Sequence, residues 1–414
     1  MIDRINIGIF GLMNAGKSTL MNLLTDQNTS IVDNKRGTTT DIKISLLELH
    51  FLGPIKLFDT AGIDEKNNLG DKKKQKTIAS LKEVDLILLV IDPSNISKEI
   101  EEIIHLSKEY KKQVLIIYNY FSNKKDNKIS FENINFLKVD LKNKNAKEIV
   151  LNFLENNYKK KEKKLDIFPS LKKEDIVFLN IPMDAETPEK RLLRPQSFIQ
   201  EHLLRRYVST FCYRMDLIKA RDDDKIEKER FINSINLLKK NNNLKLLITD
   251  SQAIDIIHKW TIDENKNEII PITTFSVIMA YTQSMGNLNK FIEGIEALKN
   301  LKKNDRILIA EACNHNRIKE DIGIYQIPKK INDHFKDGFI KIDHAFGREF
   351  SSFDLNQYKL IIHCGGCMID KQKMQSRLFD LNKSNVSITN YGLVLSYFNS
   401  KNAFNRVIKP FMKV

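Results

Sequence analysis

The amino-acid sequence predicts an α/β protein built from several domains. Short apolar runs typical of buried parallel strands recur along the chain, and segments with apolar residues three or four positions apart separate them. A length of 414 residues with 42% hydrophobic content allows two to four separate cores. The almost wholly basic segment Lys159 to Lys164 and the nearby Pro169 place the first domain boundary near residues 157 to 174.

Charge and hydropathy narrow the class of protein. The formal net charge is +14, but lysine, asparagine and isoleucine are frequent throughout, so we expect a solvated lysine surface and no nucleic-acid partner. No run of about 18 apolar residues is present, and Met1 to Arg4 leads directly into a strand; we therefore expect a cytoplasmic protein without a membrane span. Four cysteines in so long a chain do not form a disulfide framework.

The first domain, expected over residues 1–160, opens with a phosphate-binding motif. The buried strand Ile5 to Phe10 leads into Gly11-Leu-Met-Asn-Ala-Gly-Lys-Ser18, and a helix follows through Leu24. In this strand-loop-helix context the loop N–H groups cradle a β-phosphate, the lysine spans the β- and γ-phosphates, and the serine ligates Mg²⁺. The residues expected to bind nucleotide here are Asn14, Ala15, Gly16, Lys17, Ser18 and Thr19.

Further motifs follow in the order that a GTPase needs. Thr39, within Gly37-Thr-Thr-Thr-Asp41, is placed to close on Mg²⁺ and the γ-phosphate, and Asp59 ends a strand where it can contact Mg²⁺ through water. Gly62 would offer its N–H to the γ-phosphate, so we expect Lys17, Thr39 and Gly62 to be the catalytic groups.

These motifs resemble the branch of small GTPases that acts in ribosome assembly and tRNA modification. The resemblance implies that Asn14 helps to bind a K⁺ ion that substitutes for an arginine finger. Ile63 stands where Ras-like proteins carry the glutamine that orients water. We therefore expect slow, potassium-stimulated GTP hydrolysis.

The base-reading motif departs from this class. The strand Gln113 to Tyr118 should lead into Asn-Lys-x-Asp, but the chain continues Asn119-Tyr-Phe-Ser122. A literal Asn123-Lys124-Lys-Asp126 lies four residues later. The register favours Asn119 as the nucleotide-binding residue, with Asn123, Lys124 and Asp126 as the alternative, and we expect weakened guanine specificity.

The rest of the chain alternates strands and helices, which predicts mainly parallel sheets. We expect Cys212, which lies among Phe211, Tyr213 and Met215, to be a buried structural thiol. The expected strands are Asp175 to Pro182, Leu244 to Thr249, Arg306 to Ala310, Leu360 to Ile362 and Val386 to Asn390, and the expected helices are Ser197 to Arg206, Lys290 to Lys299 and Lys371 to Leu381.

Two of these strands end in soft metal ligands. Cys313-Asn-His315 follows one strand and His363-Cys364-Gly-Gly-Cys367 follows another, so both groups should emerge at the same edge of a parallel sheet. Five candidate ligands exceed the four of tetrahedral zinc, and a Cys-x-x-Cys pair also occurs in redox couples. From the residues alone, an iron–sulfur cluster, a zinc site and a redox pair all remain open.

Taken together, the chain resembles the HydF family, the GTPases that mature FeFe-hydrogenase. The stretches that carry the resemblance are Asn14 to Ser18, Gly37 to Asp41, Ile248 to Gln252, Thr273 to Ser276, Cys313 to His315, His363 to Cys367 and Thr389 to Gly392. The resemblance implies a P-loop GTPase domain, a middle α/β dimerisation domain over residues 172–268 and a C-terminal α/β iron-sulfur-cluster domain of the tetramerisation type over residues 269–414. It also implies a 4Fe-4S cluster on Cys313, Cys364 and Cys367, with His363 as a possible fourth ligand.

The function implied is that of a scaffold or carrier. Such a protein receives a transient di-iron precursor from two radical-SAM maturases and delivers it to apo FeFe-hydrogenase, while GTP and GDP regulate the exchange of partners. A homodimer or homotetramer is implied as well. The alternative is an Era/TrmE-like GTPase of RNA modification or ribosome assembly with a structural zinc site, whose RNA binding would weaken steeply with salt.

Overall fold

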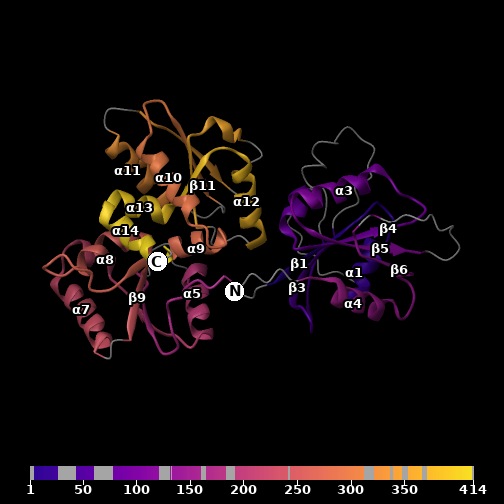
Figure 1. The fold of residues 1–414 in the computed structure, drawn as a ribbon, viewed down its shortest axis with the longest axis horizontal. Coiled ribbons are helices and arrows are strands. Elements are labelled where there is room, and N and C mark those ends of the chain that lie inside the picture. Colours follow the sequence, from indigo (N-terminus) through magenta and orange to yellow (C-terminus); the bar gives the residue numbers. More distant parts are fainter. Residues whose placement is uncertain are drawn as a thin grey trace. The chain divides into compact units, whose positions relative to one another are not determined.

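The computed structural model describes residues 4–26, 43–59, 78–120, 131, 133–159, 165–182, 192–240, 243–311, 321–335, 339–346, 353–365 and 371–412. The chain forms two compact units, one of residues 2–162 and one of residues 163–414. Figure 1 shows strands and helices in both units, which agrees with the α/β class predicted from the sequence. None of the described helices combines the length and the apolar character needed to cross a bilayer.

The first unit contains a sheet of six described strands in the order β2-β3-β1-β4-β5-β6. All neighbours are parallel except β2 and β3. Helices cover both faces, because α1 and α4 contribute to one apolar cluster and α3 to another (Figure 1). The elements are β1 (Ile5–Phe10), α1 (Lys17–Thr25), β2 (Lys43–Leu49), β3 (Gly53–Asp59), β4 (Leu86–Ile91), α3 (Lys98–Glu109), β5 (Gln113–Asn119), β6 (Phe136–Val139) and α4 (Ala146–Asn157).

The second unit contains two parallel sheets of four described strands each. The first has the order β10-β9-β7-β8 and the second the order β12-β11-β13-β14. The elements up to β10 are β7 (Ile176–Asn180), α5 (Arg194–Arg205), β8 (Ser209–Tyr213), α6 (Leu217–Arg221), α7 (Lys225–Lys239), β9 (Leu244–Thr249), η1 (Ser251–Ala253), α8 (Ile254–Trp260) and β10 (Ile272–Thr274). The remainder are α9 (Phe275–Gln283), α10 (Asn289–Lys299), β11 (Arg306–Glu311), η2 (Ile322–Gln326), α11 (Ile327–His334), β12 (Lys341–Phe346), η3 (Leu355–Gln357), β13 (Leu360–His363), α12 (Lys371–Lys383), β14 (Ser387–Asn390), α13 (Tyr391–Asn399), α14 (Lys401–Ile408) and η4 (Lys409–Phe411).

Strand β8 corrects one expectation. Cys212 lies on this edge strand and is exposed, so the prediction of a buried thiol was wrong. The physical reason is that, among the described strands, β8 pairs with β7 alone, and its alternate side chains point away from the core. The Cys212 Sγ instead accepts a bond from Gln200 Nε2 at 3.6 Å.

The two sheets of the second unit share a continuous apolar core that reaches from Phe178 on β7 to Leu308 on β11. Strand β10 pairs with β9 in the first sheet, although it lies beyond the division expected at residue 268. The hydroxyl of Thr273 on β10 donates to the Val407 carbonyl of α14 at 2.8 Å. This hydrogen bond therefore ties α14 to the first sheet.

Candidate functional site

The phosphate-binding loop has the conformation that its sequence requires. It connects β1 to α1, and Gly16 lies just before α1 with φ 105°. A methyl group at Gly16 would lie 2.3 Å from Asn119 Nδ2, so both the backbone angle and the space demand glycine. Asn14, the expected K⁺ ligand, is exposed in the loop with φ 61°.

Hydrogen bonds fix the lysine and the serine of the loop. Lys17 is buried, and its ammonium donates to the Leu12 carbonyl at 2.8 Å, which holds the charge against the loop. The Ser18 hydroxyl donates to Asp59 Oδ2 at 2.9 Å and thereby joins α1 to the end of β3. Two hard oxygen donors at this spacing suit a Mg²⁺ ion.

Asn119 connects the loop to the other side of the site. It is the last residue of β5 and is 1% exposed. Its Nδ2 donates to the Ala15 carbonyl at 3.0 Å, and its Oδ1 accepts from the Leu141 N–H at 3.2 Å. One side chain thus ties the phosphate-binding loop to the segment that follows β6.

Several expected residues fall outside the described ranges. Thr39 and Gly62 belong to this group, as does the alternative base-reading set Asn123, Lys124 and Asp126. Their roles stay predictions.

The cysteine site lies in the second unit. Strands β11 and β13 are parallel neighbours, with Ala310 opposite His363, so their carboxyl ends meet at one edge, as expected. Cys364 follows β13, is partly buried, and its N–H donates to the Ala310 carbonyl at 3.1 Å. Cys313, His315 and Cys367 lie outside the described residues.

Within the described ranges, no three His, Cys, Asp or Glu side chains gather around one point. Cys364 supplies one soft donor at this edge, and the roles of Cys313 and Cys367 stay predictions.

His363 has a contact at each ring nitrogen. The side chain is fully buried, Arg377 Nε donates to its Nε2 at 3.1 Å, and its Nδ1 lies 2.6 Å from the Cys364 carbonyl oxygen. Since Nε2 accepts, Nδ1 carries the proton and donates. Burial and the Arg377 guanidinium lower the pKa of His363 to about 3, so the ring is neutral. To act as a ligand through Nε2, His363 would have to release Arg377.

Sequence reasoning missed the residues around this strand end. Arg377, on α12, is 2% exposed, and nothing in the helical pattern distinguishes it from a surface arginine. The Tyr391 hydroxyl donates to Glu311 Oε1 at 3.1 Å, and both residues are buried. Burial, and then the charges of Cys364 and Glu311, raise the pKa of Tyr391 well above its usual value. Tyr391 lies in a stretch that carried the family resemblance, which was the only signal for it.

The fold and the first site define a P-loop GTPase domain on a chain with two further α/β domains. Three family models match successive parts of the chain: 50S ribosome-binding GTPase over residues 6–120, hydrogen maturase F dimerization domain over residues 167–284 and hydrogen maturase F tetramerization domain over residues 289–410. The chain belongs to the HydF family of hydrogenase maturases.

Curated relatives match the GTPase part. The chain is 27% identical over 181 residues to a GTPase Der from a Nitratiruptor species, which covers 42% of this chain and 39% of the relative. It is 42% identical over 110 residues to a tRNA modification GTPase MnmE from Malacoplasma penetrans, which covers 26% of this chain and 24% of the relative. The chain therefore spans about two fifths or less of the length of these curated relatives.

Among solved structures, Era from Aquifex aeolicus is 20% identical with a TM-score of 0.29, covering 51% of this chain and 93% of that chain.

Proposed function

We propose that this protein is an FeFe-hydrogenase maturation GTPase that acts as a scaffold or carrier for a di-iron cofactor precursor. The observation that carries the proposal is the union, in one chain, of a GTPase domain with both hydrogen maturase F domains. The precursor is cargo that arrives from two radical-SAM maturases and leaves with apo FeFe-hydrogenase. The names of the two maturase domains favour a homodimer or homotetramer, and the thiolate chemistry favours a cytoplasmic setting.

Cys313, Cys364 and Cys367 would hold a 4Fe-4S cluster. When bound, the cluster supplies an iron without a cysteine ligand, at which the cargo can attach. The chain's own contribution is positional: the Cys364 N–H donates to Ala310 on β11, and Gln283 Nε2 donates to the Gly365 carbonyl at 2.8 Å. These two bonds hold the described part of the cysteine loop against β11 and α9.

The GTPase domain would regulate the exchange of partners. Lys17 would contact the phosphates of GTP or GDP, Ser18 would ligate Mg²⁺, and Asp59 would act through a bound water. Thr39 and Gly62 would respond to the γ-phosphate. Hydrolysis should be slow, because Ile63 stands in the place of the water-orienting glutamine. Asn14 would bind K⁺, so hydrolysis should run faster in potassium than in sodium salts. Equal rates in the two salts would contradict the potassium site.

The first test is anaerobic reconstitution with iron and sulfide, followed by metal analysis and EPR spectroscopy of the reduced protein. The parent protein should bind about four irons and four sulfides per chain. Cys364→Ser should lose most of the reduced-cluster signal. Cys212→Ser is the matched control, because Cys212 is an exposed thiol on a different sheet, and it should retain the signal.

One tightly bound zinc without sulfide would contradict the cluster and would move the assignment to the zinc-containing RNA GTPase. If the cluster is present, the cargo role is tested by incubating the precursor-loaded protein with apo-hydrogenase and measuring hydrogen evolution. A cluster-bearing protein that never activates the apo-hydrogenase would refute the carrier role.

A further inference from the structure

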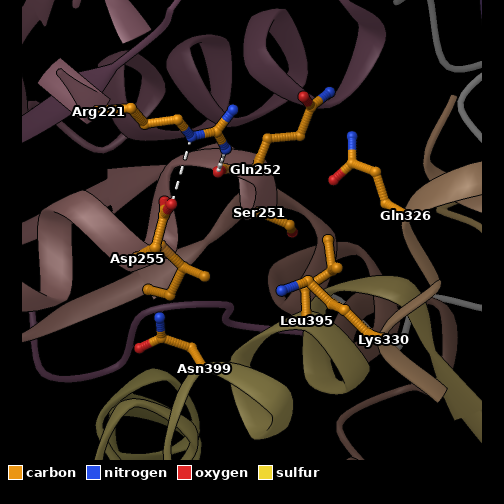
Figure 2. Close-up of a pocket in the computed structure, with 9 residues that line it drawn as sticks. Arg221, Ser251, Gln252, Asp255, Gln326, Lys330, Leu395 and Asn399 are labelled. Atoms are coloured by element: carbon orange, nitrogen blue, oxygen red, sulfur yellow. Dashed lines mark hydrogen bonds and ion pairs between the residues drawn. The ribbon is translucent and has the colours of Figure 1, made fainter. Parts of the chain in front are cut away.

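A small polar hollow lies among helices of the second unit. Its walls come from α6, η1 and α8 on one side and from η2, α11 and α13 on the other (Figure 2). The hollow is partly open to solvent, and its space, including the part that belongs to open solvent, is about 280 Å³. The side chains that matter for its chemistry are those of Arg221, Ser251, Asp255, Lys330 and Asn399.

Among the residues that the structure describes, two polar atoms of this hollow have no hydrogen-bond partner. Ser251 is 8% exposed, and its buried Oγ has no partner. Asp255 accepts from Arg221 Nε at 3.3 Å through Oδ2, whereas its Oδ1 is shielded from solvent and has no partner. A buried polar atom without a partner costs about 1–3 kcal/mol, so both atoms call for a ligand or a water.

The same walls carry an excess of positive charge. Arg221 is held in place by Asp255 and by the Gln252 carbonyl, to which Nη2 donates at 2.8 Å. Lys330 extends into the hollow, and no described residue forms a hydrogen bond or ion pair with its ammonium (Figure 2). With two cations and one carboxylate, the hollow favours an anion.

We propose that this hollow binds a small oxyanion that retains a proton, of which hydrogen phosphate is the simplest example. Its charged oxygens lie against Lys330 and Arg221, and the Ser251 hydroxyl donates to one of them. Its O–H donates to Asp255 Oδ1, which is an acceptor without a donor in the present structure. The bound anion spans both sides of the hollow and so bridges the dimerization and tetramerization domains.

The carboxylate of Asp255 sets the selectivity. An oxyanion with a proton gives Asp255 a hydrogen bond, whereas a fully ionised one places an oxygen lone pair against a negative charge. A site built to bond a ligand O–H rejects an analogue without it, because the site's own polar group is left unpaired. Phosphate keeps a proton at neutral pH and sulfate does not, so the two anions have similar shapes but differ in this one bond.

The test is isothermal titration of the full chain with sodium phosphate and, separately, with sodium sulfate at pH 7.4 and constant ionic strength. The protein is saturated beforehand with GDP and Mg²⁺, so that its phosphate-binding loop is filled. We expect saturable binding of phosphate about tenfold tighter than that of sulfate. Absence of saturable phosphate binding, or equal affinity for both anions, overturns the proposal.

Variants locate the bound anion. Lys330→Gln should weaken phosphate binding about tenfold, because it removes a charge-assisted bond. Lys329→Gln is the matched control, because Lys329 is the exposed neighbour in α11, and it should leave the affinity unchanged. Asp255→Asn should shrink the preference for phosphate over sulfate. An affinity that Lys330→Gln leaves unchanged, or that Lys329→Gln lowers equally, places the anion elsewhere and refutes the site.

Discussion

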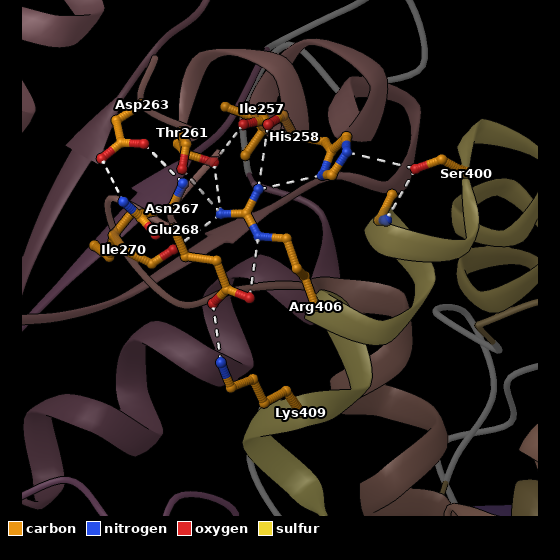
Figure 3. Close-up of polar contacts among 11 residues, drawn as sticks. Ile257, His258, Thr261, Asp263, Asn267, Glu268, Ile270, Ser400, Arg406 and Lys409 are labelled. Carbon is orange, nitrogen blue, oxygen red and sulfur yellow. Dashed lines mark hydrogen bonds and ion pairs between the residues drawn. The ribbon is translucent and has the colours of Figure 1, made fainter. Parts of the chain in front are cut away.

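Arg406 joins helix α14 to the layer that contains the first sheet. Replacing Arg406 with methionine would show how much this connection contributes to the free energy of unfolding. The side chain is 1% exposed. Figure 3 shows its polar contacts. Its Nη2 donates to the Thr261 carbonyl at 3.1 Å, to Thr261 Oγ1 at 2.9 Å and to the Ile270 carbonyl at 3.1 Å. Its Nη1 donates to the carbonyl and to Nδ1 of His258, both at 3.2 Å. Methionine retains the apolar stem and removes every one of these donors.

The expected loss of stability follows from those contacts. The carbonyls of His258, Thr261 and Ile270 would each lose a partner, at about 1 kcal/mol apiece. The ion pair with Glu268, at 3.9 Å, adds little, because that carboxylate is 30% exposed and keeps Lys409 at 3.2 Å. Arg406→Met should therefore lower the free energy of unfolding by about 3–4 kcal/mol, most of it from the lost hydrogen bonds.

Urea unfolding followed by tryptophan fluorescence measures this directly. Trp260 is the only tryptophan in the chain, is 2% exposed and lies next to Thr261, so the signal reports the second unit alone. With an m-value of about 3 kcal/mol per M, the midpoint should fall by about 1 M. Lys409→Met is the control and should shift the midpoint little, because Lys409 is 66% exposed. If both variants shift the midpoint by the same amount, the buried network does not hold α14 in place.

Two further predictions concern the first site and pH. Asn119→Ala should weaken GDP binding about ten- to thirty-fold, because two buried hydrogen bonds at the phosphate-binding loop are lost. Asn135→Ala is the control and should leave the affinity unchanged, because it removes only an exposed amide contact. Fluorescence titration measures the affinity of each variant for GDP, and equal affinities would contradict the prediction. Lowering the pH from about 7.5 to 5.5 should destabilise the second unit, because burial, and then Arg406, lower the pKa of His258 in the folded chain. The stability that His258 contributes is therefore present above about pH 6.5 and is lost as the pH falls. Arg406→Met should weaken this dependence of the unfolding free energy on pH. If the dependence is the same in the variant, Arg406 does not lower the pKa of His258.

The sequence predicts well those features that depend on residues close together in the chain. The phosphate-binding loop lies within eight consecutive residues, and strands β1 and β9 begin and end where their apolar runs do. The meeting of the β11 and β13 ends was predictable, because parallel strands of one sheet place their carboxyl ends at the same edge.

What the sequence does not predict depends on distant residues. The partners of Arg406 lie 136 to 148 positions away along the chain, and a lone arginine on an amphipathic helix is typical of a surface position. The contact of Arg377 with His363 has the same character, because it exists only once α12 packs against β13. Cys212 shows the opposite error: its apolar neighbours in the sequence suggested a buried position, but it lies exposed on an edge strand.

The short polar stretches that carry the family resemblance outside the cysteine and nucleotide motifs have a structural explanation. Asn390 caps α13 by accepting from the Leu393 N–H at 3.1 Å, and its Nδ2 donates to Ser276 Oγ at 2.8 Å. The Gly392 N–H donates to the same Ser276 Oγ at 3.2 Å. A methyl group on Gly392 would lie 2.8 Å from Ser276 Cβ and 3.0 Å from Ser251 Oγ, so only glycine lets α13 approach α9 and η1 this closely.

The three stretches around Ser251, Ser276 and Asn390 follow β9, β10 and β14, so the carboxyl ends of both sheets converge on one junction. Cys364 follows β13, which pairs with β14, while Ser251 also lines the proposed anion site. The junction therefore lies between two sites of different chemistry. Its residues are better explained by close packing of the dimerization and tetramerization domains than by contact with a metal.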